Sequence, residues 1–331
     1  MSTALIRAYR VLQESGLSGH VPERVDGAKN NEVWFAGPYV LRIAALRTSE
    51  RLDWEAEVAN VLPAGVPHAQ VLARGTTEFG QWMVSRRVAG SPLSTCWPDL
   101  DDAQRREAIS QLGAALEALH ACPGPLDEDG VPVVPPFLRD ADSIECPHQL
   151  PPSRLLALVD RARRLRGVDA GLFDATADVI NECAGALSGE RPRGLVHGDL
   201  HLQNVLWDPG HDRLTAVLDF EWSRLAPADL DLDVLLRFCR DAARLVAPNE
   251  KQRLRRHDFL AVPIWLRERY PALFAHPRLQ DRLRLYALAY DIPQLLADPP
   301  RIPVSELPEF HAYHRIRRLV EGRSHAGWAL V

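Results

Sequence analysis

The chain has 331 residues, of which 46% are hydrophobic and 25% are charged, an ordinary composition for a soluble protein of two domains or lobes. The formal net charge of -5 at pH 7 argues against a general nucleic-acid binder, because nucleic-acid-binding domains are usually basic. The five scattered cysteines form no C-x-x-C pair, residues 1–19 lack a signal-peptide core, and no apolar run approaches the ~18 residues of a membrane span. These features predict a cytoplasmic protein with free thiols and no membrane or nucleic-acid partner.

The first 88 residues are expected to form a small lobe built on a sheet. Apolar residues at helical spacing predict a helix over 2–15, and Gly37-Pro38 separates two expected strands that end at Phe35 and begin at Tyr39. Thr48 or Ser49 is expected to cap a helix that runs to about residue 62, and β-like runs follow at 70–74 and 81–88. The stretch Val-Ala-Gly-Ser-Pro-Leu from residue 88 breaks the pattern and places a hinge or linker at 89–98.

The remainder, residues 99–331, is expected to be a larger and mainly helical lobe. Apolar periodicity predicts helices at about 99–120, 153–166, 170–187, 228–245, 249–268, 277–297 and 304–321. Residues 123–152 are rich in proline and irregular, and loops of this length inside a compact domain are usually functional or mobile.

Two polar stretches, 195–207 and 218–222, contain the residues with the clearest chemistry. The apolar runs 205–207 and 214–218 flank an Asp-Pro-Gly-His-Asp-Arg turn, which predicts a β-hairpin. The start of one hairpin strand lies beside the end of the other, so Asn204 and Asp219 should meet, and Asp199 lies five residues before Asn204. Three oxygen-bearing side chains in one place suit a hard cation and a hydroxyl nucleophile.

Phosphoryl transfer to an alcohol needs a group of oxygen-bearing side chains of this kind. A carboxylate beside the acceptor hydroxyl is required, which fits Asp199, and oxygen ligands for Mg²⁺ are required, which fits Asn204 and Asp219. A rival interpretation takes His197, Asp199 and His201 as zinc ligands of a hydrolase, because alternate residues of an extended segment share a face. In the first interpretation His197 supports the shape of the loop, and His201 is structural or lines the acceptor pocket.

The motif His197-Gly-Asp199, followed after four residues by Asn204, resembles the catalytic loop of the aminoglycoside phosphotransferase and choline-kinase-like family, relatives of protein kinases. Leu218-Asp-Phe-Glu221 looks like the family's metal-binding Asp-Phe-Gly segment without its glycine, and Asp231-Leu232 match its downstream Asp-Leu pair. The likeness covers residues 25–240. It implies an α+β, protein-kinase-like two-lobe fold with a small antiparallel-sheet N-terminal lobe at 1–88 and a helical C-terminal lobe at 99–331.

The resemblance also implies roles for residues of the first lobe. Asn31-Glu-Val-Trp34 resembles the family's nucleotide loop, Arg42 stands at the phosphate-binding cation, and Glu55 at the helix glutamate that pairs with it. Many members have lysine at the cation position, so Lys29 in the loop is kept as an alternative to Arg42. The adenine is expected near the hinge, at Arg86 to Ala89 and including Val88, where it would use main-chain groups. Asp231 is expected to brace the catalytic loop.

The resulting hypothesis is a small-molecule kinase that uses ATP or GTP with Mg²⁺, works as a monomer or dimer, and phosphorylates a hydroxyl of an aminoglycoside-like or other hydroxylated antibiotic. A metabolite such as choline or homoserine is the alternative acceptor. A catalytically weak nucleotide-binding regulatory protein of the same fold is the alternative of another class. Acceptor contacts are expected from polar residues near the site and in the helical lobe: His201, Glu221, Asp229, Asp233, Tyr290, Asp291, Glu306 and Glu309.

Overall fold

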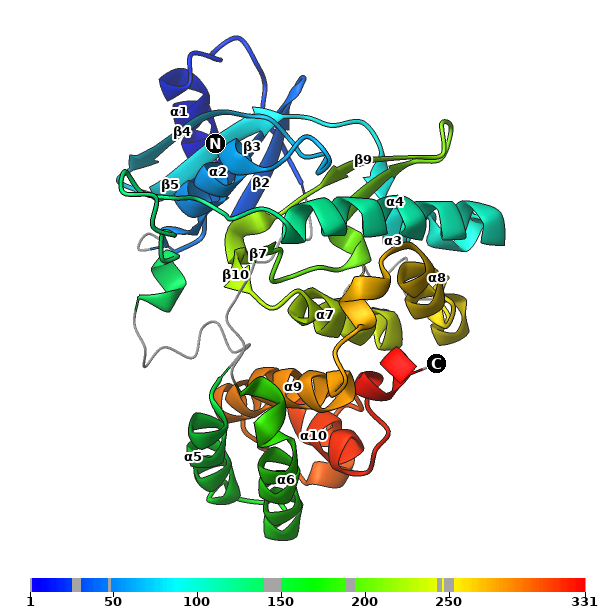
Figure 1. Ribbon diagram of the computed structural model, residues 1–331. Coiled ribbons are helices and arrows are strands. Elements are labelled where there is room, and N and C mark those ends of the chain that lie inside the picture. The colour runs from blue at the N-terminus through cyan, green and yellow to red at the C-terminus, as the bar shows by residue number, and fades with distance from the viewer. Residues whose placement is uncertain are drawn as a thin grey trace. The chain divides into compact units, whose positions relative to one another are not determined.

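We describe the protein from a computed structural model, in which residues 2–25, 31–46, 49–139, 150–188, 194–242, 246 and 253–330 are placed well enough to describe. The chain divides into two compact units (Figure 1). Unit 1 contains Met1–Asp140 and Gly194–Leu225, and unit 2 contains Ala141–Arg193 and Ala226–Val331. The segment with the central motifs is thus grouped with the N-terminal sheet, and the expected lobe boundary near residue 88 stays a prediction.

Unit 1 is built on a five-stranded antiparallel sheet with the order β1-β2-β3-β5-β4. Its strands are β1 (Glu23–Arg24), β2 (Asn31–Ala36), β3 (Tyr39–Ala44), β4 (Val71–Thr77) and β5 (Gly80–Arg86). Alternate residues of a strand point to opposite faces, so Leu41 and Ile43 pack against helix α1 (Thr3–Glu14), whereas Ala44 and Met83 pack against helix α2 (Arg51–Val61). The sheet therefore holds a helix on each face, and residue 42 of β3 shares the α2 face.

A second part of unit 1 contains the hairpin predicted from the sequence. Strands β8 (Val205–Asp208) and β9 (Arg213–Val217) pair antiparallel with Val205 opposite Val217, and β6 (Ser91–Pro92) adds a third strand. Strand β7 (Gly194–Val196) pairs with β10 (Arg224–Ala226). Helix α4 (Asp102–His120) packs against β7 and β9, and the short helix α3 (Leu93–Cys96) precedes it. The Asp101 side chain caps α4 by accepting the N–H of Gln104 at 2.8 Å.

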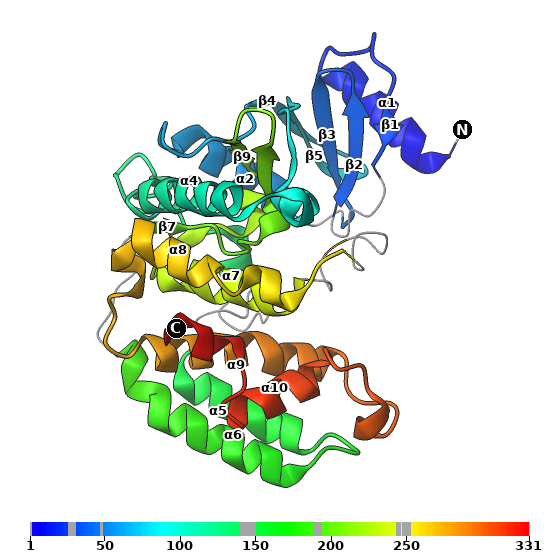
Figure 2. The same ribbon diagram turned by 90° about the vertical axis from the view of Figure 1, so that its right-hand side faces the viewer.

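The described residues of unit 2 form helices joined by loops. It contains α5 (Pro152–Arg163), α6 (Ala170–Cys183), α7 (Asp229–Arg240), α8 (Val262–Arg269), α9 (Leu279–Ala297) and α10 (Ala312–Val320). Figure 2 shows α5, α6, α9 and α10 side by side, and one buried apolar cluster joins all four. Helix α7 packs against α9 and against the C-terminal 3-10 turn His325–Leu330.

Short 3-10 helices occur in both units. They lie at Trp97–Asp99, Pro136–Leu138, Ala184–Leu187, Leu202–Asn204, Phe220–Trp222, Arg256–Phe259, Pro271–Phe274 and Val304–Glu306.

Most predicted elements are confirmed, and the errors have identifiable causes. The expected helix at 304–321 is wrong over its first half, where only a 3-10 turn lies before Pro308, because proline at this point removes a backbone donor that the helix would need. Of the expected helix at 249–268, α8 occupies the last part, and residues 249–252 lie outside the described residues. Helix α2 has Glu50 as its N-cap, whereas Ser49 was expected; Thr48 is also outside the described part.

Candidate functional site

The loop between β7 and β8 begins with a turn that only glycine can make. Gly198 has a φ of +82°, and a Cβ atom at this position would lie 2.2 Å from the backbone oxygen of Trp222 and 2.7 Å from Nη1 of Arg224. Side chains are disfavoured both by this left-handed backbone and by the close approach of the neighbouring segment. The glycine of the His-Gly-Asp motif therefore lets residues 197–199 lie directly against residues 222–224.

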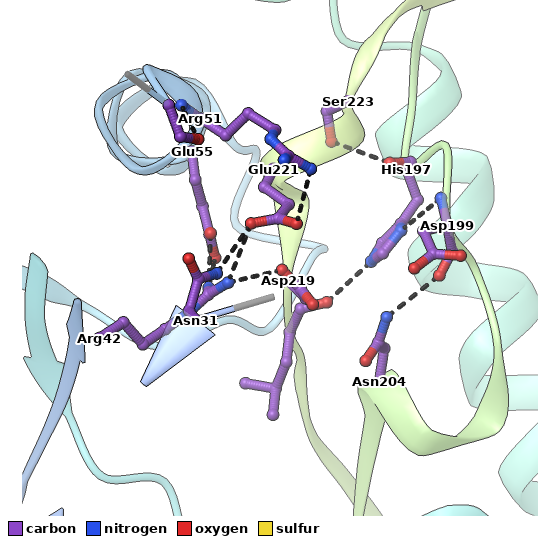
Figure 3. A network of polar contacts seen from close by, with 12 residues as sticks. Asn31, Arg42, Arg51, Glu55, His197, Asp199, Asn204, Asp219, Glu221 and Ser223 are labelled. Atoms are coloured by element: carbon purple, nitrogen blue, oxygen red, sulfur yellow. Dashed lines mark hydrogen bonds and ion pairs between the residues drawn. The ribbon is translucent and has the colours of Figure 1, made fainter. Parts of the chain in front are cut away.

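His197 fixes the backbone of this loop, as the sequence analysis expected. It is fully buried, its Nε2 lies 2.8 Å from the carbonyl oxygen of Leu218, and its Nδ1 accepts the N–H of Asp199 at 3.2 Å (Figure 3). Nε2 therefore carries the proton and Nδ1 is the acceptor. Both ring nitrogens are engaged with backbone groups, which argues against the rival zinc site of His197, Asp199 and His201.

Asp199 is held by its backbone, and its side chain reaches solvent. The side-chain nitrogen Nδ2 of Asn204 donates to the backbone carbonyl oxygen of Asp199 at 3.1 Å. The Asp199 side chain itself is 42% exposed. Nε2 of His201 lies 3.7 Å from one Asp199 carboxylate oxygen. The geometry thus presents the Asp199 carboxylate at a surface with a histidine beside it.

The hairpin brings Asn204 and Asp219 together. The N–H of Leu218 donates to the carbonyl oxygen of Asn204 at 2.8 Å, which continues the pairing of β8 with β9 by one step. Directly after Leu218, Asp219 adopts the left-handed conformation with φ 67° and ψ 60°. Aspartate enters this region more readily than most residues, and such a conformation away from glycine is often found at functional sites.

Arg42 lies at the centre of a carboxylate cluster in unit 1. Its Nη1 lies 2.6 and 2.5 Å from the two carboxylate oxygens of Glu55, the pairing that the family resemblance implied. Its Nη2 lies 2.7 Å from Oδ1 of Asp219 and 3.4 Å from Oε2 of Glu221. Strand β3, helix α2 and the segment after β9 are therefore joined through one guanidinium group (Figure 3).

The pKa values in this cluster follow from burial and from the surplus of carboxylates. Burial raises the pKa of Glu55 to about 7 against the opposing attraction of Arg42. Burial also raises the pKa of Glu221, and the nearby Asp219 charge adds to this rise. Burial would raise the pKa of Asp219 too, but the Arg42 guanidinium outweighs it and the pKa is lowered, so Asp219 stays ionised. Burial opposes the charge of Arg42, but the three carboxylates more than offset it and raise its pKa.

Sequence reasoning placed Glu221 among acceptor contacts and missed its link to Asn31 and Arg51. Glu221 is almost completely buried; its Oε2 accepts a hydrogen bond from Nδ2 of Asn31 at 3.0 Å, and its Oε1 lies 3.5 Å from Nη1 of Arg51. The Arg51 guanidinium also stacks on the Trp222 ring at 4.5 Å. Arg51 precedes Glu55 by four residues, so both lie on one face of α2, and that spacing was the signal available in the sequence.

The donor set of the motif fits a hard divalent cation. Asn204 uses its amide nitrogen on the Asp199 backbone, which leaves its oxygen as the ligand atom, and Asp219 supplies an ionised carboxylate. Ligand atoms of Glu55, Asp219 and Glu221 also lie within 4.8 Å of one another. Because Arg42 contacts all three, this second group is an ion-pair cluster as it stands.

The other residues expected at the nucleotide site are partly described. Nε of Arg86 donates to Oε1 of Gln70 at 3.1 Å, and Val88 is half-buried at the end of the sheet. The hinge is joined to the hairpin, because the hydroxyl of Thr215 donates to the carbonyl oxygen of Ala89 at 2.6 Å. Lys29 lies outside the described residues, and the nucleotide roles of Arg86 and Val88 stay predictions.

The residues expected to contact the acceptor from unit 2 are engaged in internal ion pairs. Asp229 pairs with the buried Arg282 and also accepts from the hydroxyl of Tyr286 at 3.1 Å. Asp291 lies 2.9 Å from Nη1 of Arg237 and 2.7 Å from Nε of Arg315.

The other polar residues expected at the acceptor site or the catalytic loop differ in burial and in their contacts. Asp233 is fully buried and lies 2.7 Å from Nε2 of His325, and the Tyr290 ring packs under Arg237. Asp231 is also fully buried on α7, while Glu306 and Glu309 are exposed. Their roles toward an acceptor or the catalytic loop stay predictions.

Comparison with known proteins identifies the family. The model of the phosphotransferase enzyme family matches residues 20–270. The chain is 30% identical over 200 residues to an aminoglycoside 3'-phosphotransferase of Streptomyces fradiae, covering 57% of this chain and 61% of that protein. It is 29% identical over 201 residues to the corresponding enzyme of Streptomyces ribosidificus, covering 57% of this chain and 63% of that protein. The match thus spans about three fifths of these relatives.

Solved structures show the same fold. The crystal structure of aminoglycoside phosphotransferase APH(4)-Ia aligns with a TM-score of 0.62 at 16% identity, over 97% of this chain and 99% of that one. The streptomycin-ATP-APH(2")-IIa ternary complex aligns with a TM-score of 0.59 at 16% identity, over 95% and 98%. The fold is that of the protein-kinase-like aminoglycoside phosphotransferases. None of the described helices has the length and the apolar character needed to cross a membrane. With a family match over most of its length, the chain belongs to the phosphotransferase enzyme family.

Proposed function

We propose that the protein transfers the γ-phosphate of ATP or GTP to a hydroxyl group of a small molecule. The observation that supports this proposal is the hairpin register, in which Asn204 pairs with Leu218, the residue before Asp219, while the side-chain amide of Asn204 holds the backbone of Asp199. Such a group of oxygen donors next to a solvent-reaching carboxylate is what phosphoryl transfer to an alcohol needs.

Each residue has a distinct role in this proposal. Asp199 orients the acceptor hydroxyl and takes its proton, and its 42% exposed side chain leaves room for the substrate. Asn204 and Asp219 hold Mg²⁺, which when bound neutralises charge on the transferred phosphate. Arg42, which is anchored on Glu55 through Nη1, holds the nucleotide phosphates.

The leading acceptor is an aminoglycoside-like or other hydroxylated antibiotic. The curated relatives are named aminoglycoside 3'-phosphotransferases, and solved structures with the same fold contain hygromycin B with AMP-PNP or streptomycin with ATP. These names support an aminoglycoside as the class of acceptor.

A small metabolite with fewer positive charges, such as choline or homoserine, is the second candidate. Residues 226–331 contain 17 Lys and Arg against 13 Asp and Glu. The buried carboxylates of Asp229 and Asp291 are paired with arginines, so neither is available to bind several ammonium groups. This charge balance is unlike a site built for a polycation.

A phosphate-transfer assay tests the proposal. The wild-type protein, Asp199→Asn and the control Asp208→Asn, which alters a carboxylate at the far end of β8, are incubated with radiolabelled ATP, Mg²⁺ and a panel of aminoglycosides and amino alcohols. Labelled product should form with wild type and control and fall by at least about 10²-fold in Asp199→Asn. If the wild type binds nucleotide with Mg²⁺ but phosphorylates no acceptor, a nucleotide-binding regulatory protein becomes the better interpretation.

A further inference from the structure

The Nη2 atom of Arg42 is shared by two carboxylates with different tasks. It lies 2.7 Å from Oδ1 of Asp219 and 3.4 Å from Oε2 of Glu221 (Figure 3). Under the proposed function Asp219 is a ligand of the divalent cation. A guanidinium against this partly buried carboxylate opposes a second cation there, because like charges repel. Binding of a cation by Asp219 therefore favours a looser contact between Asp219 and Arg42.

Glu221 is placed to receive Arg42. Two cation contacts of Glu221 lie within the described residues, 3.4 Å to Arg42 and 3.5 Å to Arg51. Both are longer than the roughly 2.7–2.9 Å of a close charge-assisted hydrogen bond, so either can tighten. The Glu221 side chain is only 2% exposed, and Asn31 Nδ2 fixes its Oε2 at 3.0 Å. Glu55 binds Nη1 with both oxygens, so the guanidinium is held on one side while Nη2 can turn toward Glu221.

We propose that Glu221 is a positioning residue that takes Nη2 of Arg42 from Asp219 when the divalent cation binds. The inference rests on the proposed function, since it assumes that Asp219 is a cation ligand. In this scheme Glu221 contacts neither the cation nor the substrate. Its negative charge lowers the free-energy cost of breaking the Arg42–Asp219 contact, because the buried guanidinium that loses one carboxylate gains another.

The test measures cation binding directly. Mn²⁺ is titrated into protein saturated with a non-hydrolysable ATP analogue, and free Mn²⁺ is followed by electron paramagnetic resonance. Glu221→Gln, whose amide oxygen still accepts from Asn31, should weaken Mn²⁺ binding roughly tenfold, because a neutral acceptor holds a guanidinium less strongly. Affinity for the analogue without metal should change less than about threefold.

Glu221→Gln in an Arg42→Met background distinguishes the proposal from direct ligation of the cation by Glu221. Without Arg42 there is no competitor on Asp219, so Glu221→Gln should then change Mn²⁺ affinity by less than about twofold. An equal loss in both backgrounds would show that Glu221 ligates the cation itself. No loss in the wild-type background would show that Arg42 leaves Asp219 without help from Glu221. Either result overturns the proposal.

Arg51→Met is the matched control. It removes the Arg51 guanidinium from Glu221 and should leave Mn²⁺ binding unchanged or tighter, because Arg51 no longer competes with Arg42 for the Glu221 charge. If Arg51→Met weakens Mn²⁺ binding as much as Glu221→Gln does, Glu221 acts only by maintaining the local structure, and the proposal is overturned even where Glu221→Gln folds poorly. Asp219→Asn distinguishes a failure of the Glu221 proposal from a failure of the proposed function. If this variant binds Mn²⁺ as well as wild type, Asp219 is not a cation ligand and the proposed function fails.

Discussion

Replacing Gly198 by alanine tests whether the catalytic loop depends on its close approach to residues 222–224. The new Cβ would lie 2.2 Å from the Trp222 carbonyl oxygen, a backbone atom that cannot rotate away. A left-handed backbone costs a residue with a Cβ about 1–2 kcal/mol, and forced overpacking adds roughly 1–3 kcal/mol. We expect the variant to lose about 2–5 kcal/mol of unfolding free energy together with most of its phosphate-transfer activity.

Gly16→Ala provides the control, because Gly16 has a φ of +75° and no atom within 4 Å of a built Cβ. It should show only the backbone cost. Thermal unfolding followed by circular dichroism should place Gly198→Ala roughly 1–4 °C below Gly16→Ala, the shift that about 1–3 kcal/mol for the clash alone causes in a chain of 331 residues. If the two variants unfold together and Gly198→Ala keeps its activity, the approach of the two segments is not what requires glycine.

Three further predictions concern the buried charges. Arg42→Ala should weaken nucleotide binding measured by calorimetry more than Lys29→Ala does, and the reverse order would assign the phosphate-binding cation to Lys29. Arg282→Ala leaves the buried Asp229 without its guanidinium and should lower the unfolding free energy measured in urea by roughly 3–5 kcal/mol; a loss below about 1 kcal/mol would mean that the pair is not buried in solution. The pKa of Glu55 is raised from 4.5 to about 7, so the folded protein binds more protons than the unfolded chain between these values. This contribution to stability is complete below the lower value and is lost as the pH rises through about 7. Glu55→Gln should therefore show a smaller decline in unfolding midpoint from pH 5 to 8 than wild type, and an equal decline would refute the raised pKa.

The parts of the fold that the sequence predicted are those set by local patterns. The 205–207 and 214–218 runs predicted the hairpin because two apolar stretches around a Pro-Gly turn have few alternatives, and the register then brought Asn204 to Asp219. Helix ends were less accurate. Glu50, whose side chain makes no capping hydrogen bond, precedes α2 although Ser49 offered a better capping group. Contacts with distant segments, such as the bond from Nε1 of Trp54 to the carbonyl oxygen of Ser223, also hold α2 in place.

Apart from the Arg42–Glu55 pair that the family resemblance implied, charge pairing could not be predicted from the sequence. Asp229 and Asp291 looked available for an amine-rich ligand, yet their arginine partners lie 53 and 54 residues away along the chain for Arg282 and Arg237. Pairings over such separations depend on how α7 and α9 pack, and no periodicity within either helix records it. Glu221 shows the same limit, since its hydrogen bond to Asn31 joins residues 190 positions apart.

The amide of Asn204 explains why this position carries asparagine and not aspartate. Its nitrogen donates to the Asp199 carbonyl, and its oxygen remains for a cation. An aspartate would offer the cation a stronger charge but would set two oxygen acceptors against each other at 3.1 Å, with no proton between them. Under the proposed function, the residue that ligates the cation is thus also the one that holds the base in place, so a change in either task alters the other.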